Sequence, residues 1–193
     1  MTGFTQTTDE LLYSFAGTGT QLNTFTTEAS LMGAYPACPI PGTTLTNAGM
    51  RSSSIKIKAG GRLGGSTPPT FTWFIRLTTA QPPAWLIGGT LLGQTAAVAS
   101  VSATLAPWYL EADIDLVTVA QGAASTVKTM GEVRAPLGLG SPFAATIPAN
   151  NTSPTIATID ITQQYFLWLS AACGTSLAAN LIQLEYLKVY GEN

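Results

Sequence analysis

Most of the chain lacks helical periodicity, and this constrains its fold more than any other feature. From about residue 19 onward it consists of short runs of β-branched and aromatic residues interrupted by glycine and proline. Such runs are typical of all-β sandwiches and barrels. The exception is the segment 9–15, DELLYSF, for which a short helix with Thr8 or Asp9 as its N-cap is predicted.

The pattern predicts nine or ten strands. They lie at residues 21–32, 53–63, 70–77, around 85–88, 96–105, 107–119, 126–134, 155–162, 165–172 and 180–190. The link 121–125 predicts a hairpin loop, and the glycine pairs at 60–61 and 64–65 predict bulges or a bend. Because two-sheet jelly rolls need about eight strands, we expect an all-β, jelly-roll-like β-sandwich of about 8–10 strands.

The first 45 residues differ from the rest of the chain. The stretch YPACPIPG at 35–42 places three prolines within six positions, which disfavours pairing inside a sheet. We therefore predict that residues 1–45 form an extended N-terminal arm that includes one strand and clasps a neighbouring subunit. A frayed terminus is the alternative. Residues 46–193 are predicted to form the sandwich.

Charge is scarce in this sequence. Charged residues make up 9% of the chain, against about 25% in a typical soluble domain, so we expect part of the surface to be covered by other copies. The net charge is −2 and Lys and Arg are not clustered, which argues against nucleic acid as a partner.

No apolar run reaches the length of a membrane span. The N-terminal residues do not resemble a secretory signal, so folding in the cytoplasm of the producing cell is expected.

Three carboxylates, Glu111, Asp113 and Asp115, stand at every second position of one predicted strand. Apolar residues alternate with them, as in a strand with one buried and one solvated face. Lys128 and Arg134 on the next predicted strand offer cross-strand neutralisation. A Ca²⁺ site is the less favoured alternative, because this spacing is too wide for one ion. A glycosidase would need a pair of carboxyl groups of which one is desolvated, and a solvent-exposed strand face does not supply such a group.

The sequence is also short of catalytic parts. It contains no histidine, so the usual general base and a Ser-His-Asp triad are missing. We predict no enzymatic activity, no cofactor and no metal site. Cys38 and Cys173 are predicted to be reduced, buried thiols, with a disulfide between them as the alternative.

The aromatic residues divide between core and surface. Trp73 and Trp108 share strand faces with Ile and Leu and are assigned to the core. Tyr186 and Tyr190 are predicted to share one face of the last strand with Ile182 and Leu184, which suits a subunit interface. The predicted interface residues are Phe15, Tyr35, Pro39, Pro41, Trp85, Tyr186 and Tyr190.

Several stretches resemble β-rich virion proteins of tailed bacteriophages. They are PIPGTTLT, IKIKAGGRL, TPPTFTWFIRL, PWYLEADIDL, IATIDIT and FLWLSAACGTS, all between about residues 38 and 190. The resemblance implies a jelly-roll capsid decoration, cement or head-fibre subunit. Such a subunit would be a homotrimer at the capsid surface of the virion, with the major capsid protein as its partner. It brings no catalytic residues.

A second function remains open from the sequence. A receptor- or glycan-binding module of a tail or fibre would need an exposed cluster of aromatic and amide side chains. Trp85 with Gln81 or Gln94 is the candidate cluster. A carbohydrate-active enzyme is a third and weaker alternative, because it needs the desolvated acid pair discussed above.

Overall fold

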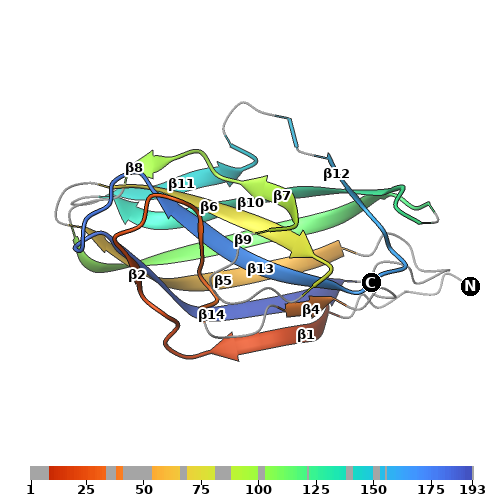
Figure 1. Cartoon of the computed structure of the whole chain (residues 1–193), viewed down its shortest axis with the longest axis horizontal. Helices are drawn as coiled ribbons and strands as arrows, with labels where there is room; N and C mark the ends of the chain where they lie inside the picture. Colours follow the sequence, from red (N-terminus) through yellow and green to blue (C-terminus); the bar gives the residue numbers. More distant parts are fainter. Residues whose placement is uncertain are drawn as a thin grey trace, which may run out of the picture.

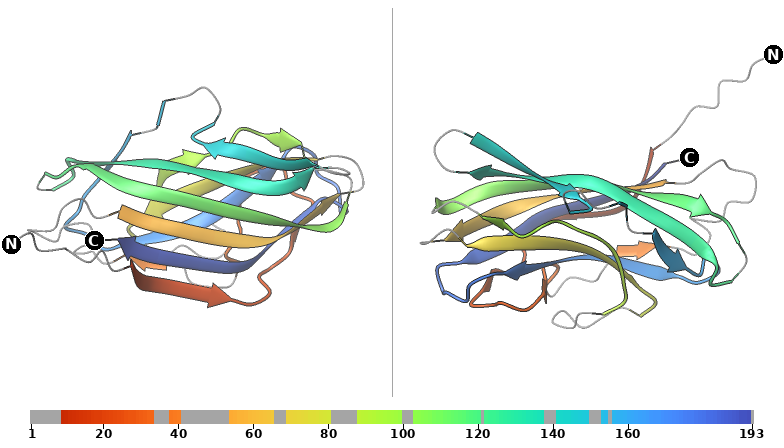
Figure 2. Two further views of the ribbon diagram at one scale, coloured as in Figure 1. Left: turned by 180° about the vertical axis from the view of Figure 1, so that it is seen from behind. Right: turned by 90° about the horizontal axis from the view of Figure 1, so that it is seen from above.

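The computed structural model is an all-β sandwich of two antiparallel sheets, consistent with a jelly-roll-like fold (Figures 1 and 2). It describes residues 9–33, 38–40, 54–65, 69–80, 88–99, 103–120, 122–137, 141–149, 153–154 and 156–192. The described part of the chain contains no helix with the length and hydropathy needed to span a bilayer. The predicted fold class is therefore confirmed.

Among the described residues, the larger sheet has eight strands. Six of them lie side by side in the order β1 (Asp9–Ala16), β14 (Leu181–Glu192), β5 (Ser54–Gly65), β9 (Ala103–Thr118), β10 (Ser125–Leu137) and β11 (Ser141–Ile147). Two short strands extend it, because β2 (Leu22–Asn23) pairs with β14 and β12 (Ile156–Ile159) pairs with β10. The predicted hairpin loop joins β9 to β10, and Gly122 there has a φ of 69°, in the left-handed region that glycine tolerates.

The smaller sheet has six strands in the described part of the chain and packs against one face of the larger sheet. Its central order is β3 (Ala29–Ser30), β13 (Tyr165–Cys173), β6 (Thr70–Thr78) and β7 (Thr90–Gln94). In addition, β4 (Cys38–Ile40) pairs with β13, and β8 (Val98–Ala99) pairs with β6. The turned view in Figure 2 shows the two sheets as separate layers.

The core lies between these layers and is centred on aromatic rings. Trp73 on β6 and Trp108 on β9 are fully buried, and their ring centroids are 5.9 Å apart, so this contact joins the two sheets. Phe71 extends the cluster, with its ring centroid 6.0 Å from that of Trp73. The indole nitrogen of Trp108 donates a hydrogen bond to the Gln183 carbonyl at 3.2 Å. The predicted core positions of Trp73 and Trp108 are confirmed.

The first 45 residues are the main correction to the predicted organisation. Residues 9–16 form strand β1 instead of a short helix, and they pair along their length with β14. The apolar spacing of this segment suits a helix turn, but pairing with β14 buries Phe15 in the core instead. Strands β2, β3 and β4 also join the sheets, so the described part of this region belongs to the sandwich. Contact with a neighbouring subunit stays a prediction.

Other differences concern weak strand signals. The strand predicted at 21–32 is reduced to β2 and β3, which are separated by residues 24–28, where Thr24 has a φ of 54°. Strands β7 and β11 were not predicted, because they are short or rich in alanine and proline. Residues 81–87, which include Trp85 and Gln81, lie outside the described residues, as do Tyr35 and Pro41.

Both cysteines are free and buried. Cys38 lies on β4 and Cys173 at the end of β13, and the predicted reduced thiols are confirmed. Burial raises the pKa of the Cys38 thiol to about 12, so it stays protonated and unreactive at neutral pH.

Candidate functional site

The outer face of the larger sheet carries regular rows of side chains, because the strands pair in register. One row, here called the aromatic row, runs across four strands through Tyr186, Gly60, Tyr109 and Arg134. The next, the charged row, runs through Lys188, Lys58, Glu111 and Glu132. Directly opposed residues in an antiparallel sheet have Cβ atoms about 5 Å apart, so the members of each row are neighbours.

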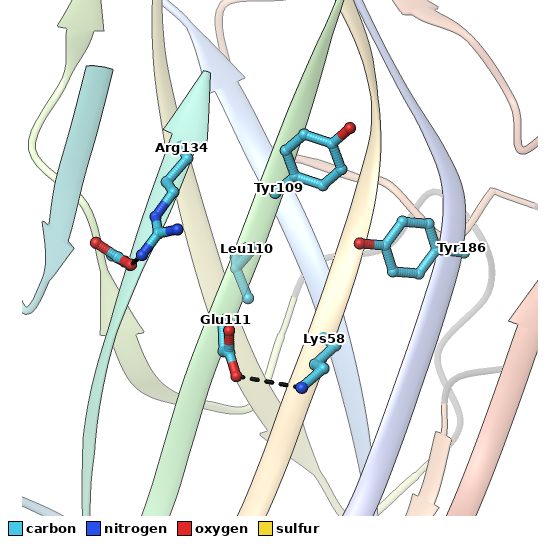
Figure 3. Close-up of a pocket in the computed structure, with 7 residues that line it drawn as sticks. Lys58, Tyr109, Leu110, Glu111, Arg134 and Tyr186 are labelled. Atoms are coloured by element: carbon cyan, nitrogen blue, oxygen red, sulfur yellow. Dashed lines mark hydrogen bonds and ion pairs between the residues drawn. The ribbon is translucent and has the colours of Figure 1, made fainter. Parts of the chain in front are cut away.

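A hollow of about 240 Å³ lies where these two rows meet (Figure 3). Its polar and aromatic lining consists of Lys58, Tyr109, Glu111, Glu132, Arg134 and Tyr186. Tyr109 is 53% exposed, and Tyr186 is half-buried. Figure 3 shows the two rings extending over β5 from opposite sides, Tyr109 from β9 and Tyr186 from β14.

Gly60 forms the floor between the two tyrosines. A Cβ atom at this position would lie 2.6 Å from Cε1 of Tyr186 and 2.9 Å from the Trp108 carbonyl oxygen. The missing side chain therefore makes the space in which the Tyr186 ring lies close to β5. Burial raises the pKa of Tyr186 above its usual value of 10, and the proximity of Tyr109 and Glu111 adds to this shift. Its phenol is thus a neutral donor at physiological pH.

A β-bulge places Tyr186 on this face. The pairing of β14 with β5 shifts register between Leu184 and Tyr186, which inserts one extra residue, Glu185. Arg62 on β5 holds Glu185 through an ion pair of 2.7 Å. The buried residues of this strand are Ile182, Leu184, Leu187 and Val189. The predicted shared face of Tyr186 and Tyr190 with Ile182 and Leu184 is therefore wrong: the tyrosines lie outside, together with Lys188.

The charges of the hollow occur as ion pairs. Lys58 Nζ lies 3.4 Å from Glu111 Oε1, with side chains 46% and 55% exposed. Arg134 pairs with Glu132 on its own strand. Beyond the hollow, Lys128 Nζ lies 3.9 Å from Asp115 Oδ2. Cross-strand neutralisation is thus confirmed for Lys128, whereas Arg134 neutralises an acid of its own strand.

The alternating acids of β9 lie on the solvated side of the strand, as predicted. Their neighbours Leu110, Ala112 and Ile114 are buried. Burial raises the pKa of Asp113, a shift that Lys56 opposes. Its Oδ1 has no hydrogen-bond partner among the described residues. Lys56 instead pairs with Glu192, whose pKa is lowered chiefly by that hydrogen bond.

A second polar cluster lies on the outer face of the smaller sheet and is covered. Arg76 on β6 forms a bidentate pair with Glu28, with both nitrogen–oxygen distances 2.6 Å. These side chains are only 17% and 15% exposed. Ser170 donates a hydrogen bond to the same carboxylate, and the Arg76 guanidinium lies 5.8 Å from the Phe74 ring centroid. Trp168, the register partner of Arg76, is buried.

The predicted interface residues are not gathered at one place. Phe15 is buried in the core, Pro39 is exposed on β4, and Tyr186 and Tyr190 lie on the outer face of β14. Their role in subunit contacts stays a prediction. Of the predicted glycan cluster, Gln94 is exposed at the end of β7. The structure instead brings together Tyr109 and Tyr186, of which Tyr109 was not singled out from the sequence.

The outward orientation of Tyr109 could have been predicted from the sequence. It stands two residues before Glu111, in the same alternation that places the acids outside, so an aromatic ring on the polar face followed from the pattern. Gly60 was read only as a candidate bulge position. Among the described residues, no three His, Cys, Asp or Glu side chains are grouped as metal ligands would be.

Comparisons with known proteins give little beyond this geometry. No family model and no curated protein matches the chain. Among solved structures, it is similar to the CBM2 module of an evolved Dit protein from Lactobacillus casei BL23 phage J-1. The identity is 11% and the TM-score 0.33, over 97% of this chain and 96% of that one. A similarity at this level carries no argument about fold or function, which rest here on the chain's own residues.

Proposed function

We propose that this chain is a non-catalytic glycan-binding module of a bacteriophage virion, of the tail- or fibre-associated kind. The observation that carries the proposal is the pair Tyr109 and Tyr186, held over Gly60 beside exposed charged side chains. The virion setting is supported by the resemblance of the strand sequences to phage virion proteins. The glycan-binding role is supported by the chemistry of the hollow.

A sugar ring has an apolar face and a rim of hydroxyl groups. An exposed tyrosine offers a rigid apolar plane with a polar tip, and ionised side chains make stronger hydrogen bonds than neutral ones. The hollow combines both within two adjacent rows of one sheet. The sheet fixes their spacing before any ligand arrives, which lowers the entropic cost of binding.

The capsid decoration function stays a prediction with a weaker physical basis. A cement subunit needs broad contacts to the shell, such as an arm reaching over a neighbour. The hollow instead presents two rings amid charged groups, an arrangement that favours a small polar ligand. The expected homotrimer is compatible with either role, because several weak sites on one particle give avidity.

The test is binding of the purified protein to a glycan array and to cell-wall polysaccharide of the bacterial host. We expect binding to depend on Tyr109 and to be much weaker in Tyr109→Ala. Tyr190→Ala is the matched control, because Tyr190 lies on the same face but does not line the hollow. Binding to empty capsid shells, without glycan binding, would reject this proposal in favour of the decoration function.

A further inference from the structure

We propose that the hollow selects uncharged sugars that present two adjacent hydroxyl groups, and that it rejects acidic glycans. This inference rests on the proposed glycan-binding function and adds the class of ligand. It follows from how the charges around Tyr109 and Tyr186 are arranged.

The charges that line the hollow cancel. Two cations, Lys58 and Arg134, face two carboxylates, Glu111 and Glu132, and each cation already has a carboxylate partner. Glu111 and Glu132 are also direct register partners, so their carboxylates lie on neighbouring strands. An acidic sugar would have to displace one of these carboxylates from its cation and then remain beside both. Like charges at such separations are costly.

Lys188 does not reverse this balance. It is the register partner of Lys58 and extends the charged row away from the hollow, and it is exposed to solvent. On the other side of the charged row, Asp113 stands opposite Lys56. The exposed charge of Lys188 is screened by salt, and Lys56 is already paired with Glu192, so neither lysine adds much selectivity for an anion.

The pair of Lys58 and Glu111 suits a diol. Its separation of 3.4 Å exceeds the usual N–H···O distance of about 2.9 Å, and both side chains are about half exposed. Each atom therefore keeps hydrogen-bonding capacity for a ligand. A hydroxyl group both donates and accepts. One sugar hydroxyl can accept from the Lys58 ammonium group while its neighbour donates to the Glu111 carboxylate, which gives two charge-assisted hydrogen bonds.

The tyrosines complete the same selection without adding charge. Burial and the nearby Glu111 keep the phenol of Tyr186 protonated. Both hydroxyls lie over β5, in the row next to that of the Lys58–Glu111 pair (Figure 3). A pyranose ring stacked on Tyr109 or Tyr186 would have the neutral tyrosine hydroxyl groups close to it. Its own hydroxyl groups would reach the Lys58–Glu111 ion pair.

The experiment is calorimetric titration of the full chain with two sets of fragments. One set is neutral hexose oligosaccharides, and the other is oligogalacturonate and poly(glycerol phosphate), at low and high salt. We expect the neutral set to bind, with affinity nearly independent of salt. Lys58→Met and Glu111→Gln should each weaken this binding about tenfold, since each removes a hydrogen bond to a charged group. Circular dichroism verifies that the variants are folded.

The variant Glu111→Gln separates the outcomes. If an acidic fragment binds the wild-type protein in a Tyr109-dependent manner and Glu111→Gln tightens it, glycan binding stands and the selectivity proposal is overturned. If neither set binds, or if Tyr109→Ala binds as well as the wild type, the glycan-binding function itself fails and the selectivity proposal falls with it.

Discussion

The outer faces of the two sheets carry the same kinds of side chains in opposite settings. On the smaller sheet, Arg76 and Glu28 form a covered bidentate pair near Phe74. On the larger sheet, Lys58 and Glu111 form an open pair near the tyrosines. The exposed fractions are 17% and 15% for the first pair, against 46% and 55% for the second.

This difference in solvent exposure decides what each cluster can do. The Glu28 carboxylate accepts from Arg76 and from Ser170, so its acceptor positions are largely occupied and solvent is mostly excluded. Removing one member leaves the other desolvated without a partner. The Lys58–Glu111 pair is solvated and contributes little to stability, which leaves it available to a ligand. One cluster is thus closed to solvent and costly to break, whereas the other is open to solvent.

The largest expected effect is on the covered pair. Glu28→Gln should lower the free energy of unfolding by about 3 kcal/mol, because it leaves the Arg76 charge buried without a counter-charge. Glu111→Gln, the same substitution on the open face, should change it by less than about 1 kcal/mol. Urea unfolding of both variants measures the difference. Equal losses would show that cover does not distinguish the two faces.

The next effect concerns the exposed ring of the hollow. Tyr109→Ala should reduce glycan affinity roughly 30-fold, as for an aromatic anchor worth about 2 kcal/mol. Its stability should change by less than about 1 kcal/mol, since Tyr109 is 53% exposed. Titration calorimetry and thermal unfolding measure the two quantities. A large loss of stability with unchanged affinity would make Tyr109 structural.

A smaller effect is expected from filling the floor of the hollow. Gly60→Ala puts a methyl group where the Tyr186 ring lies and should lower affinity about tenfold, with about 1 kcal/mol lost from stability through overpacking. The double-mutant cycle with Tyr186→Ala provides the control. If the methyl group acts by displacing the ring, it should cost less affinity once the ring is absent. Additive losses of affinity would contradict that mechanism.

The smallest expected effect is the pH response of Asp113. Burial raises its pKa in the folded protein, so the unfolded chain ionises more readily and ionisation disfavours folding. This penalty is present at neutral pH and disappears as the pH falls through the folded pKa to below the usual 3.8. Because solvent screens this partly exposed carboxylate, Asp113→Asn should gain less than about 1 kcal/mol at pH 7, and the gain should vanish near pH 3. A gain that persists there would exclude this cause.

Much of the fold was predictable from local pattern. The strands β5, β6, β9 and β10 alternate apolar and polar residues, and the inward positions of Trp73 and Trp108 follow from that period of two. Strand β1 was misread because its apolar spacing also fits a helix turn. Its state is set by pairing with β14, about 170 residues away in sequence, and such tertiary contacts override weak local preference.

The site was predictable only in part. The outward direction of Tyr109 and Glu111 follows from the alternation along β9. The direction of Tyr186 depends on the bulge at Glu185. In the sequence, apolar residues of this strand recur every second position, except that Leu184 and Leu187 are three positions apart. The closeness of Tyr109 and Tyr186 needs the order of β14, β5 and β9 in the sheet, which no local pattern contains.

The pairing of β1 with β14 has a mechanical consequence. Asp9 is the register partner of Glu192, so the start of β1 and the end of β14 lie side by side at the same end of this edge of the sheet (Figure 1). Force that separates these two points peels the strands apart one residue pair after another. A force between the hollow and this end of the sheet acts along the strands instead. The inter-strand hydrogen bonds lie perpendicular to the strands, so many of them resist such a force at the same time. If the protein were anchored at this end of the sheet, the pull of a glycan polymer bound at the hollow would act along the strands, the direction in which the sheet resists force best.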